Sequence, residues 1–180
     1  MLHIEGTLLY HSWEKKKEKN FLMMSKKLQI IFKVLIIFLF SISISGAELL
    51  KPNSNIKPIK VVEIQLIGLQ KNDANYKDSG IEQTWNFAHP NNRKVTGPFL
   101  KFKAMIKGDA YQMMIDHLSH TITQLGSGNN WAQFEVIILD KEKTYHKFNW
   151  QVEKYTMDGP LKDCWLTTMV SNPIPLGSSI

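Results

Sequence analysis

The apolar residues of this chain change their spacing part-way along it, and that change limits the folds it can adopt. Over residues 58–108 they recur every three or four positions, as in amphipathic helices. From His120 onward they alternate with polar residues, as in half-buried strands. Helices followed by antiparallel strands predict an α+β domain. We expect three N-terminal helices packed on a curved antiparallel sheet of about four strands.

The helices are predicted from their start and stop signals. Pro58 and Pro98 each suit the first turn of a helix. Ser79 and Glu82 have the spacing of a capping box, which predicts the start of a further helix. Residues 89–97 are predicted to form a polar loop, which is either a structural turn or the rim of a site. The predicted helices cover residues 58–71, 79–88 and 98–107.

The second half of the chain predicts strands joined by short turns. Residues 111–116 fit either a helical turn or a strand. Residues 172–180 contain two prolines, a glycine and two serines, which predicts a flexible tail. The predicted strands cover residues 120–124, 131–139, 145–155 and 164–170.

An apolar run near the N-terminus predicts export. Lys26 and Lys27 precede an apolar stretch at residues 34–44, and small residues at 45–47 follow it. That order is typical of a cleavable signal peptide, here residues 23–47. A membrane-spanning helix needs about 20 apolar residues, more than this run supplies. The sequence therefore predicts a periplasmic or extracellular protein that meets a membrane only through this segment; the alternative is an uncleaved anchor.

Residues 1–22 place a long polar segment ahead of the signal peptide, which is unusual for exported proteins. Met23 and Met24 stand where a start codon is expected. We interpret residues 1–22 as an extension produced by a wrongly assigned start, the alternative being a genuine charged N-terminus. Residues 48–57 then form a linker, and residues 58–171 a single domain.

Charge argues against a nucleic-acid partner. The whole chain carries a net charge of +6, but residues 1–47 hold seven lysines and three glutamates. The remaining 133 of the 180 residues therefore carry only +2. Nucleic-acid binding requires a clustered basic footprint, which that part of the chain lacks.

Cysteine and histidine usage points to no metal and no cofactor. Cys164 is the only cysteine, so an intramolecular disulfide is impossible. Its apolar neighbours indicate a buried small side chain rather than a reactive thiol. The spacing of His117 and His120 alone does not define a metal site, since no H-E-x-x-H motif or cysteine pair accompanies it.

Short pieces spread over residues 61–117 carry a resemblance to a known family. They are residues 69–73, 80–81, 87–88, 90–93, 96–98, Phe102, Tyr111 and His117, and residues 165–167 also fit. On these pieces the chain resembles the domain-of-unknown-function 4864 family of exported bacterial and plant plastid proteins. The resemblance implies the cone-shaped fold of nuclear-transport-factor-2-like proteins, also called SnoaL-like or cystatin-like. It implies no activity, because none is established for that family.

Three titratable residues are the candidate catalytic groups. In a helical turn, Asp116 and His120 share a face, and the carboxylate can orient the imidazole. In an extended chain, His117 and His120 point to opposite faces. The alternative is that all three are surface or satisfied core residues.

Four residues are the candidate binding groups. Trp85 and Trp150 either line an apolar ligand cavity or fill the core. Arg93 is expected at a loop rim, where it would meet an acidic ligand, and Tyr111 is a further binding candidate.

Two functions follow as hypotheses. The first is a non-enzymatic module that binds a small apolar ligand or a protein partner, including a second copy of itself. The second is a small cone-fold enzyme, similar to hydrolases or isomerases, that uses an Asp/His pair. Fold resemblance does not decide between them, because function depends on the site.

Overall fold

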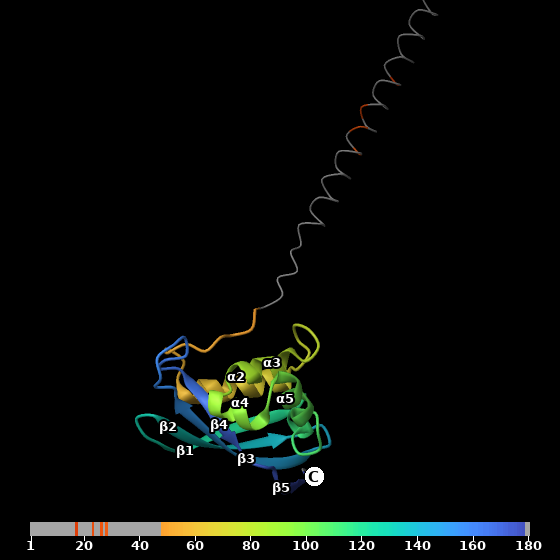
Figure 1. Cartoon of the computed structure of the whole chain (residues 1–180). Coiled ribbons are helices and arrows are strands. Elements are labelled where there is room, and N and C mark those ends of the chain that lie inside the picture. The colour runs from red at the N-terminus through yellow and green to blue at the C-terminus, as the bar shows by residue number, and fades with distance from the viewer. Residues whose placement is uncertain (1–16, 18–22, 24–25, 27, 29–47, 179–180) are drawn as a thin grey trace, which may run out of the picture. The chain divides into compact units, whose positions relative to one another are not determined.

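The computed structural model describes residues 48–178, together with residues 17, 23, 26 and 28 (Figure 1). Apart from those four positions, the predicted extension at 1–22 and the predicted signal peptide at 23–47 lie outside the described residues. Residues 47–180 form a compact unit by themselves, and the fold below is the fold of that unit.

The α+β class is confirmed, but the number and place of the helices differ from the prediction. Residues 48–178 contain four α-helices, and these lie between residues 58 and 106 rather than at the N-terminus. A short 3-10 turn, η1 (Gln112–Met114), falls in the segment that fitted either a turn or a strand. The helices are α2 (Pro58–Gln70), α3 (Ser79–Asn86), α4 (Pro90–Thr96) and α5 (Phe99–Ile106).

The polar loop predicted at residues 89–97 is wrong, since most of it forms helix α4. Pro90 disfavours helix in the residue before it and so ends α3, but it also occupies the first turn of α4. His89 caps the new helix, because its Nδ1 accepts a hydrogen bond from the backbone N–H of Asn91 at 3.0 Å. One proline therefore both stops a helix and starts the next.

The predicted helix at Ser79 is confirmed, but the capping box is wrong. The N-cap residue is Asp78, which has a left-handed backbone (φ 68°) and makes no side-chain cap hydrogen bond. Ser79 lies inside the helix and donates its hydroxyl hydrogen to the Asn72 carbonyl at 2.9 Å. Glu82 instead accepts a hydrogen bond from the Tyr76 hydroxyl at 2.8 Å.

The sheet has five antiparallel strands rather than about four, and it is open. Its order is β1-β2-β3-β4, and β5 pairs with β3 beyond the end of β4. Register shifts at Gln124/Gly126 and Gln151/Val152 mark bulges, which increase local twist and bend the sheet. The strands are β1 (Ser119–Ser127), β2 (Trp131–Leu139), β3 (Thr144–Lys154), β4 (Trp165–Val170) and β5 (Ile174–Ser178).

Strand β5 lies where the sequence predicted a flexible tail. The prediction rested on residue types such as Pro175 and Gly177. In the structure Gly177 has a φ of +106°. Proline is nevertheless tolerated in an edge strand, where its missing N–H costs no ladder hydrogen bond. All five residues of β5 are exposed, so pairing with β3 rather than burial holds this segment.

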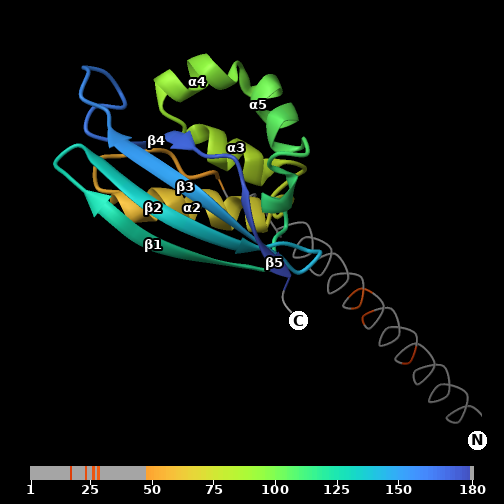
Figure 2. The ribbon, with the colours of Figure 1, turned by 90° about the horizontal axis from the view of Figure 1, so that it is seen from below.

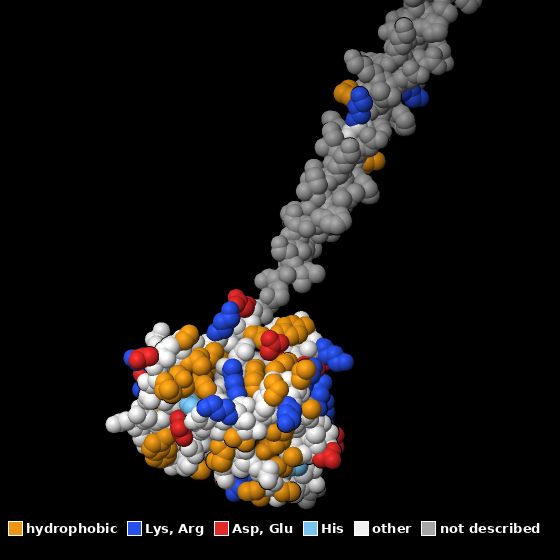
Figure 3. All heavy atoms as spheres, in the orientation of Figure 1, with side chains coloured by type: hydrophobic (Ala, Val, Ile, Leu, Met, Phe, Trp, Pro, Cys, Tyr) orange, Lys and Arg blue, Asp and Glu red, His pale blue; other side chains and the backbone are white. Residues whose placement is uncertain are grey.

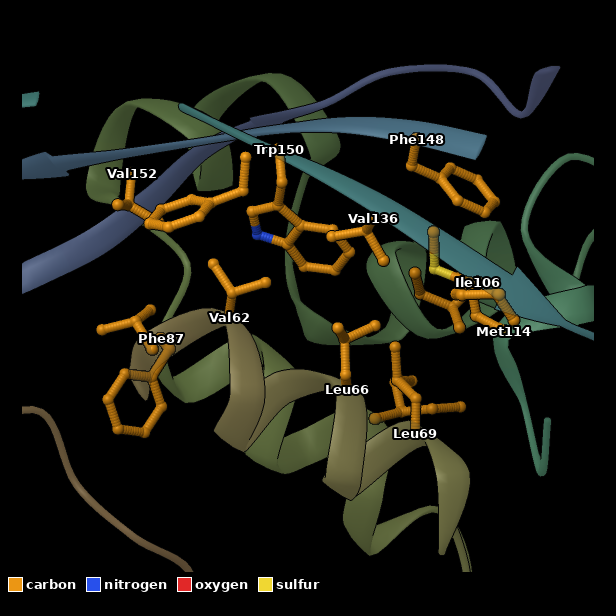
Figure 4. Packing of buried hydrophobic residues seen from close by; sticks show 14 of the residues in the cluster. Val62, Leu66, Leu69, Phe87, Ile106, Met114, Val136, Phe148, Trp150 and Val152 are labelled. Carbon is orange, nitrogen blue, oxygen red and sulfur yellow. The ribbon is translucent and has the colours of Figure 1, made fainter. Parts of the chain in front are cut away.

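The helices cover one face of the sheet, and the core lies between the two layers (Figure 2). Alternate residues of β2 and β3 point toward the helices and are buried. Figure 4 shows the Trp150 indole pointing from β3 toward α2, where Val62, Leu66 and Leu69 form the facing stripe. Helices α2 and α3 cross at Gly68 and Gly80, where their backbones are in direct contact.

Residues 48–57 have no helix or strand, and they contact the domain at Leu50 and at Ile56, which packs against the core. The side-chain amide of Gln83 accepts from the backbone N–H of Leu50 at 2.8 Å and donates to its carbonyl at 2.9 Å. The predicted linker therefore lies against α3 at Leu50.

Candidate functional site

A cavity of about 80 Å³ lies between the helices and the sheet. It is bounded by α2, α3, α4 and α5, by Tyr111 and Met114 around η1, and by β3 and β4. Apolar side chains make up most of its lining, as in small-molecule sites generally. The lining residues are Gln65, Leu69, Thr84, Ala88, Asn92, Thr96, Phe102, Met105, Ile106, Tyr111, Met114, Trp150, Thr167 and Val170.

A buried polar network forms one wall of the cavity. Thr167 Oγ1 donates to Gln65 Oε1 at 2.5 Å and accepts from the indole N–H of Trp150 at 3.1 Å. The other end of the Gln65 amide donates to the Thr84 carbonyl at 2.9 Å. Each of these polar groups is buried and has a partner, which is the condition under which polar groups are tolerated in a core. The network holds the ring of Trp150 and gives the cavity a hydrogen-bonded polar wall.

Other residues that line the cavity make longer polar contacts. The Tyr111 hydroxyl lies 3.5 Å from the Val170 carbonyl and 3.4 Å from Asn172 Oδ1. Burial raises the pKa of Tyr111, so the hydroxyl keeps its hydrogen near neutral pH. Asn92 Nδ2 donates to the Thr167 carbonyl at 3.2 Å, which links α4 to β4. Long contacts of this kind leave hydrogen-bonding capacity at the edge of the cavity.

Two of the four predicted binding residues line the cavity, Trp150 and Tyr111. Trp85 and Arg93 do not. The Arg93 guanidinium stacks 4.8 Å above the Trp85 ring and donates to the Trp85 carbonyl at 2.7 Å. It also donates to the Asn86 carbonyl at 3.1 Å. Arg93 thus satisfies orphan carbonyls at the end of α3 rather than standing free at a rim.

The predicted catalytic carboxylate, Asp116, does not bond to a histidine. It has a left-handed backbone (φ 54°), and its carboxylate accepts from Lys141 Nζ at 2.9 Å and from the Asn72 N–H at 3.3 Å. The two predicted histidines bond to each other instead, with His117 Nε2 and His120 Nδ1 2.7 Å apart. Asp116, His117 and His120 are close together in the sequence. In the structure Asp116 contacts Lys141 and Asn72, whereas the two histidines contact each other.

The hydrogen-bond pattern assigns the protons of this histidine pair. His117 Nδ1 lies 2.7 Å from the Met114 carbonyl, which can only accept, so that nitrogen carries a hydrogen. His117 Nε2 then accepts the hydrogen of His120 Nδ1. Burial lowers the pKa of both histidines, which favours the neutral rings. Neither ring lines the cavity.

A histidine–carboxylate contact that the sequence analysis missed lies elsewhere. His146 Nε2 and Asp140 Oδ2 are 2.6 Å apart, and both residues are buried. Asp140 also accepts from the Thr144 N–H at 2.8 Å, so it shapes the β2–β3 turn. The pair borders an open depression of about 590 Å³ together with Lys107 and Lys141. The sequence did carry a signal for this contact. Asp140 directly follows a predicted strand, and His146, six residues later, is an inward position of the next strand.

Cys164 is buried, as predicted, and burial raises the pKa of its thiol. Within residues 48–178 and the four described residues before them, no group of three or more His, Cys, Asp or Glu is placed to hold a metal ion. In the same part of the chain no helix is long and apolar enough to cross a membrane.

Comparisons of this chain with protein-family models, with curated proteins and with solved structures found no match. The site geometry therefore carries the functional argument.

Proposed function

We propose that this chain is an exported, non-enzymatic protein that binds a small, mainly apolar ligand in the cavity between its helices and its sheet. One observation carries the proposal: a cavity of about 80 Å³ with a mainly apolar lining and a hydrogen-bonded polar wall at Gln65 and Thr167. An engineered apolar cavity of about 150 Å³ binds benzene or xenon. The cavity of this protein is about half as large, so it suits a smaller group, such as a small ring or the end of an alkyl chain.

The proposal includes the SnoaL-like cone fold and export through residues 23–47. Four helices on one face of an open, bulged antiparallel sheet support the fold, and so does a cavity between the layers. The order of basic, apolar and small residues supports export.

Binding is favoured over acid–base catalysis because of what the cavity lining contains. It includes no Asp, Glu, His, Lys, Arg or Cys side chain, and its one ionisable group, Tyr111, stays protonated. A general base must reach the proton that it removes. The alternative of an enzyme with an Asp/His pair therefore has no support at the cavity, where Asp116 and His120 are absent.

Native mass spectrometry of the protein purified from the cells that produce it tests the proposal. Ala88 lines the cavity and Ala104 is exposed on α5, so Ala88→Leu and Ala104→Leu make the same chemical change inside and outside it. We expect a bound small molecule on the wild type and on Ala104→Leu, and none on Ala88→Leu. The same spectrum gives the mature N-terminus, expected at Glu48.

Equal ligand occupancy in the two variants would contradict a ligand in this cavity. A mature N-terminus at Met1 would contradict export by signal cleavage.

A further inference from the structure

The turn between α4 and α5 exposes apolar side chains that no part of the domain covers. Val95 is 87% exposed and Leu100 is 73% exposed, more than any other large apolar side chain in residues 48–178. Pro98 between them is exposed as well. We call residues 94–101 the α4–α5 tip. Clustered exposed apolar groups on one turn indicate a surface that another apolar phase covers.

The α4–α5 tip also carries positive charge that the fold does not neutralise. Residues 83–108 contain five basic residues and no Asp or Glu. Lys103 and Lys107 pair with the buried Asp78, and Arg93 is held over Trp85. The other two basic residues are Lys94 and Lys101, which are exposed and have no ion pair among the described residues. Figure 3 shows Lys and Arg side chains interspersed with apolar ones on the face over these helices.

The local structure leaves the side chains of the α4–α5 tip exposed, namely Lys94, Val95, Leu100 and Lys101. Helix α5 buries Phe102 and Ile106 on its inner face, so Leu100 and Lys101 fall on the outer one. Gly97 has a φ of +84°, and a Cβ at this position would lie 2.7 Å from the Cδ of Lys101, so the aliphatic stem of Lys101 passes close to the turn. Figure 2 shows α4 and α5 standing out from the rest of the helical layer. The tip therefore consists of the ends of two regular helices joined by Gly97 and Pro98.

The same segment forms part of the cavity wall. Thr96 lies within the tip and lines the cavity, and Phe102 and Met105 follow directly on α5. The outer side of α4 and α5 is therefore basic and apolar, while their inner side faces the proposed ligand. Whatever the tip contacts is separated from the cavity only by these two short helices.

We propose that the α4–α5 tip docks on an anionic lipid bilayer. Val95 and Leu100 enter the outer acyl region, and Lys94 and Lys101 meet the headgroup phosphates, as the apolar and basic sides of interfacial segments do. This inference rests on the proposed function in one respect: it makes the ligand of the cavity a membrane-borne apolar molecule that passes between α4 and α5. The charge of the tip selects an anionic membrane over a neutral one.

An environment-sensitive nitrobenzoxadiazole dye on Val95→Cys tests the docking in the full chain. Met157→Cys is the matched control, because Met157 is also highly exposed, at 67%, but lies outside the tip. The native Cys164 is buried, and unsubstituted protein gives its background labelling. Vesicles of phosphatidylglycerol with phosphatidylcholine are compared with vesicles of phosphatidylcholine alone. Comparing the two dye positions separates docking of the tip from any membrane contact made by residues 23–47.

We expect a blue shift and a gain in emission at position 95 with anionic vesicles, and neither change at position 157. Lys94→Gln and Lys101→Gln should each weaken the apparent vesicle affinity about fivefold, and added salt should weaken it further. Lys77→Gln, which removes an exposed lysine elsewhere, should leave it unchanged.

Three results would overturn docking: no response at position 95, the same response with neutral vesicles, or the same response at position 157. The first would point to a protein partner for the tip. The cavity variant Ala88→Leu separates the two proposals, because it should dock normally while losing the ligand. Normal docking with no ligand on any variant would leave the tip assigned and contradict only the cavity.

Discussion

At the scale of single residues, the histidine pair shows how burial sets chemistry. His117 is buried against the Met114 carbonyl, and His120 donates to it from the start of β1. Burial is the largest influence and lowers the pKa of both rings. The Met114 carbonyl and Asp116 act to raise the pKa of His117, and Glu63 on α2 acts to raise that of His120, but burial outweighs them. The pair is better suited to holding η1 against β1 than to transferring protons at the cavity.

This pair makes stability depend on pH. Below the ordinary histidine pKa of 6.5, the unfolded chain binds protons on His117 and His120 that the folded chain does not. The free energy of unfolding should therefore fall as the pH drops from about 7.5 to about 5. In His120→Gln, whose amide can still donate to His117, the fall should be smaller. Urea unfolding at the two pH values measures it, and an equal fall in both proteins would contradict the assignment.

The sequence predicted individual site residues only where the alternation of apolar and polar residues was enough to show which side chains are buried. Trp150 was found because it alternates with polar neighbours on a strong strand, and that strand forms a wall of the cavity. Arg93 was expected at a rim because its segment was interpreted as a loop, whereas α4 turns its side chain back onto α3. Gln65 and Thr167 were missed, since their bond joins residues 102 positions apart.

At the scale of elements, local signals predicted the types well and the boundaries less well. The predicted helices beginning near Pro58, Ser79 and Pro98 all exist, since proline and helical periodicity are local properties. Helix α4 was missed because a single Pro90 serves two helices. Strand β5 was missed because its pairing with β3 is a long-range contact that its own prolines do not signal.

The contact between α2 and α3 depends on one glycine. A Cβ at Gly80 would lie 1.9 Å from the Gly68 carbonyl oxygen, so the helices would have to separate. We expect Gly80→Ala to lower the free energy of unfolding by about 3 kcal/mol or more, through overpacking. Gly126→Ala is the control, because its Cβ would meet only the Trp131 ring at 3.4 Å. Chemical denaturation of both variants checks this; a Gly80→Ala protein as stable as Gly126→Ala would show that the close crossing is absent.

At the scale of the whole domain, α4 and α5 supply one part of the cavity lining. Their inner residues meet side chains from α2, β3 and β4, so the space depends on elements far apart in the sequence. Composition and periodicity predicted an apolar interior, and they could not distinguish a filled interior from a hollow one. The function proposed here depends on that distinction.

The most direct test of the cavity is nuclear magnetic resonance of the protein under xenon, which occupies small apolar cavities. The indole N–H of Trp150 borders the cavity and bonds to Thr167, so its signal reports on occupancy. Trp150→Phe assigns that signal among the five tryptophans of the chain. We predict a saturable shift of the Trp150 signal in the wild type and in Ala104→Leu, and none in Ala88→Leu. An unmoved Trp150 signal in the wild type, or an equal shift in Ala88→Leu, would contradict a ligand cavity at this site.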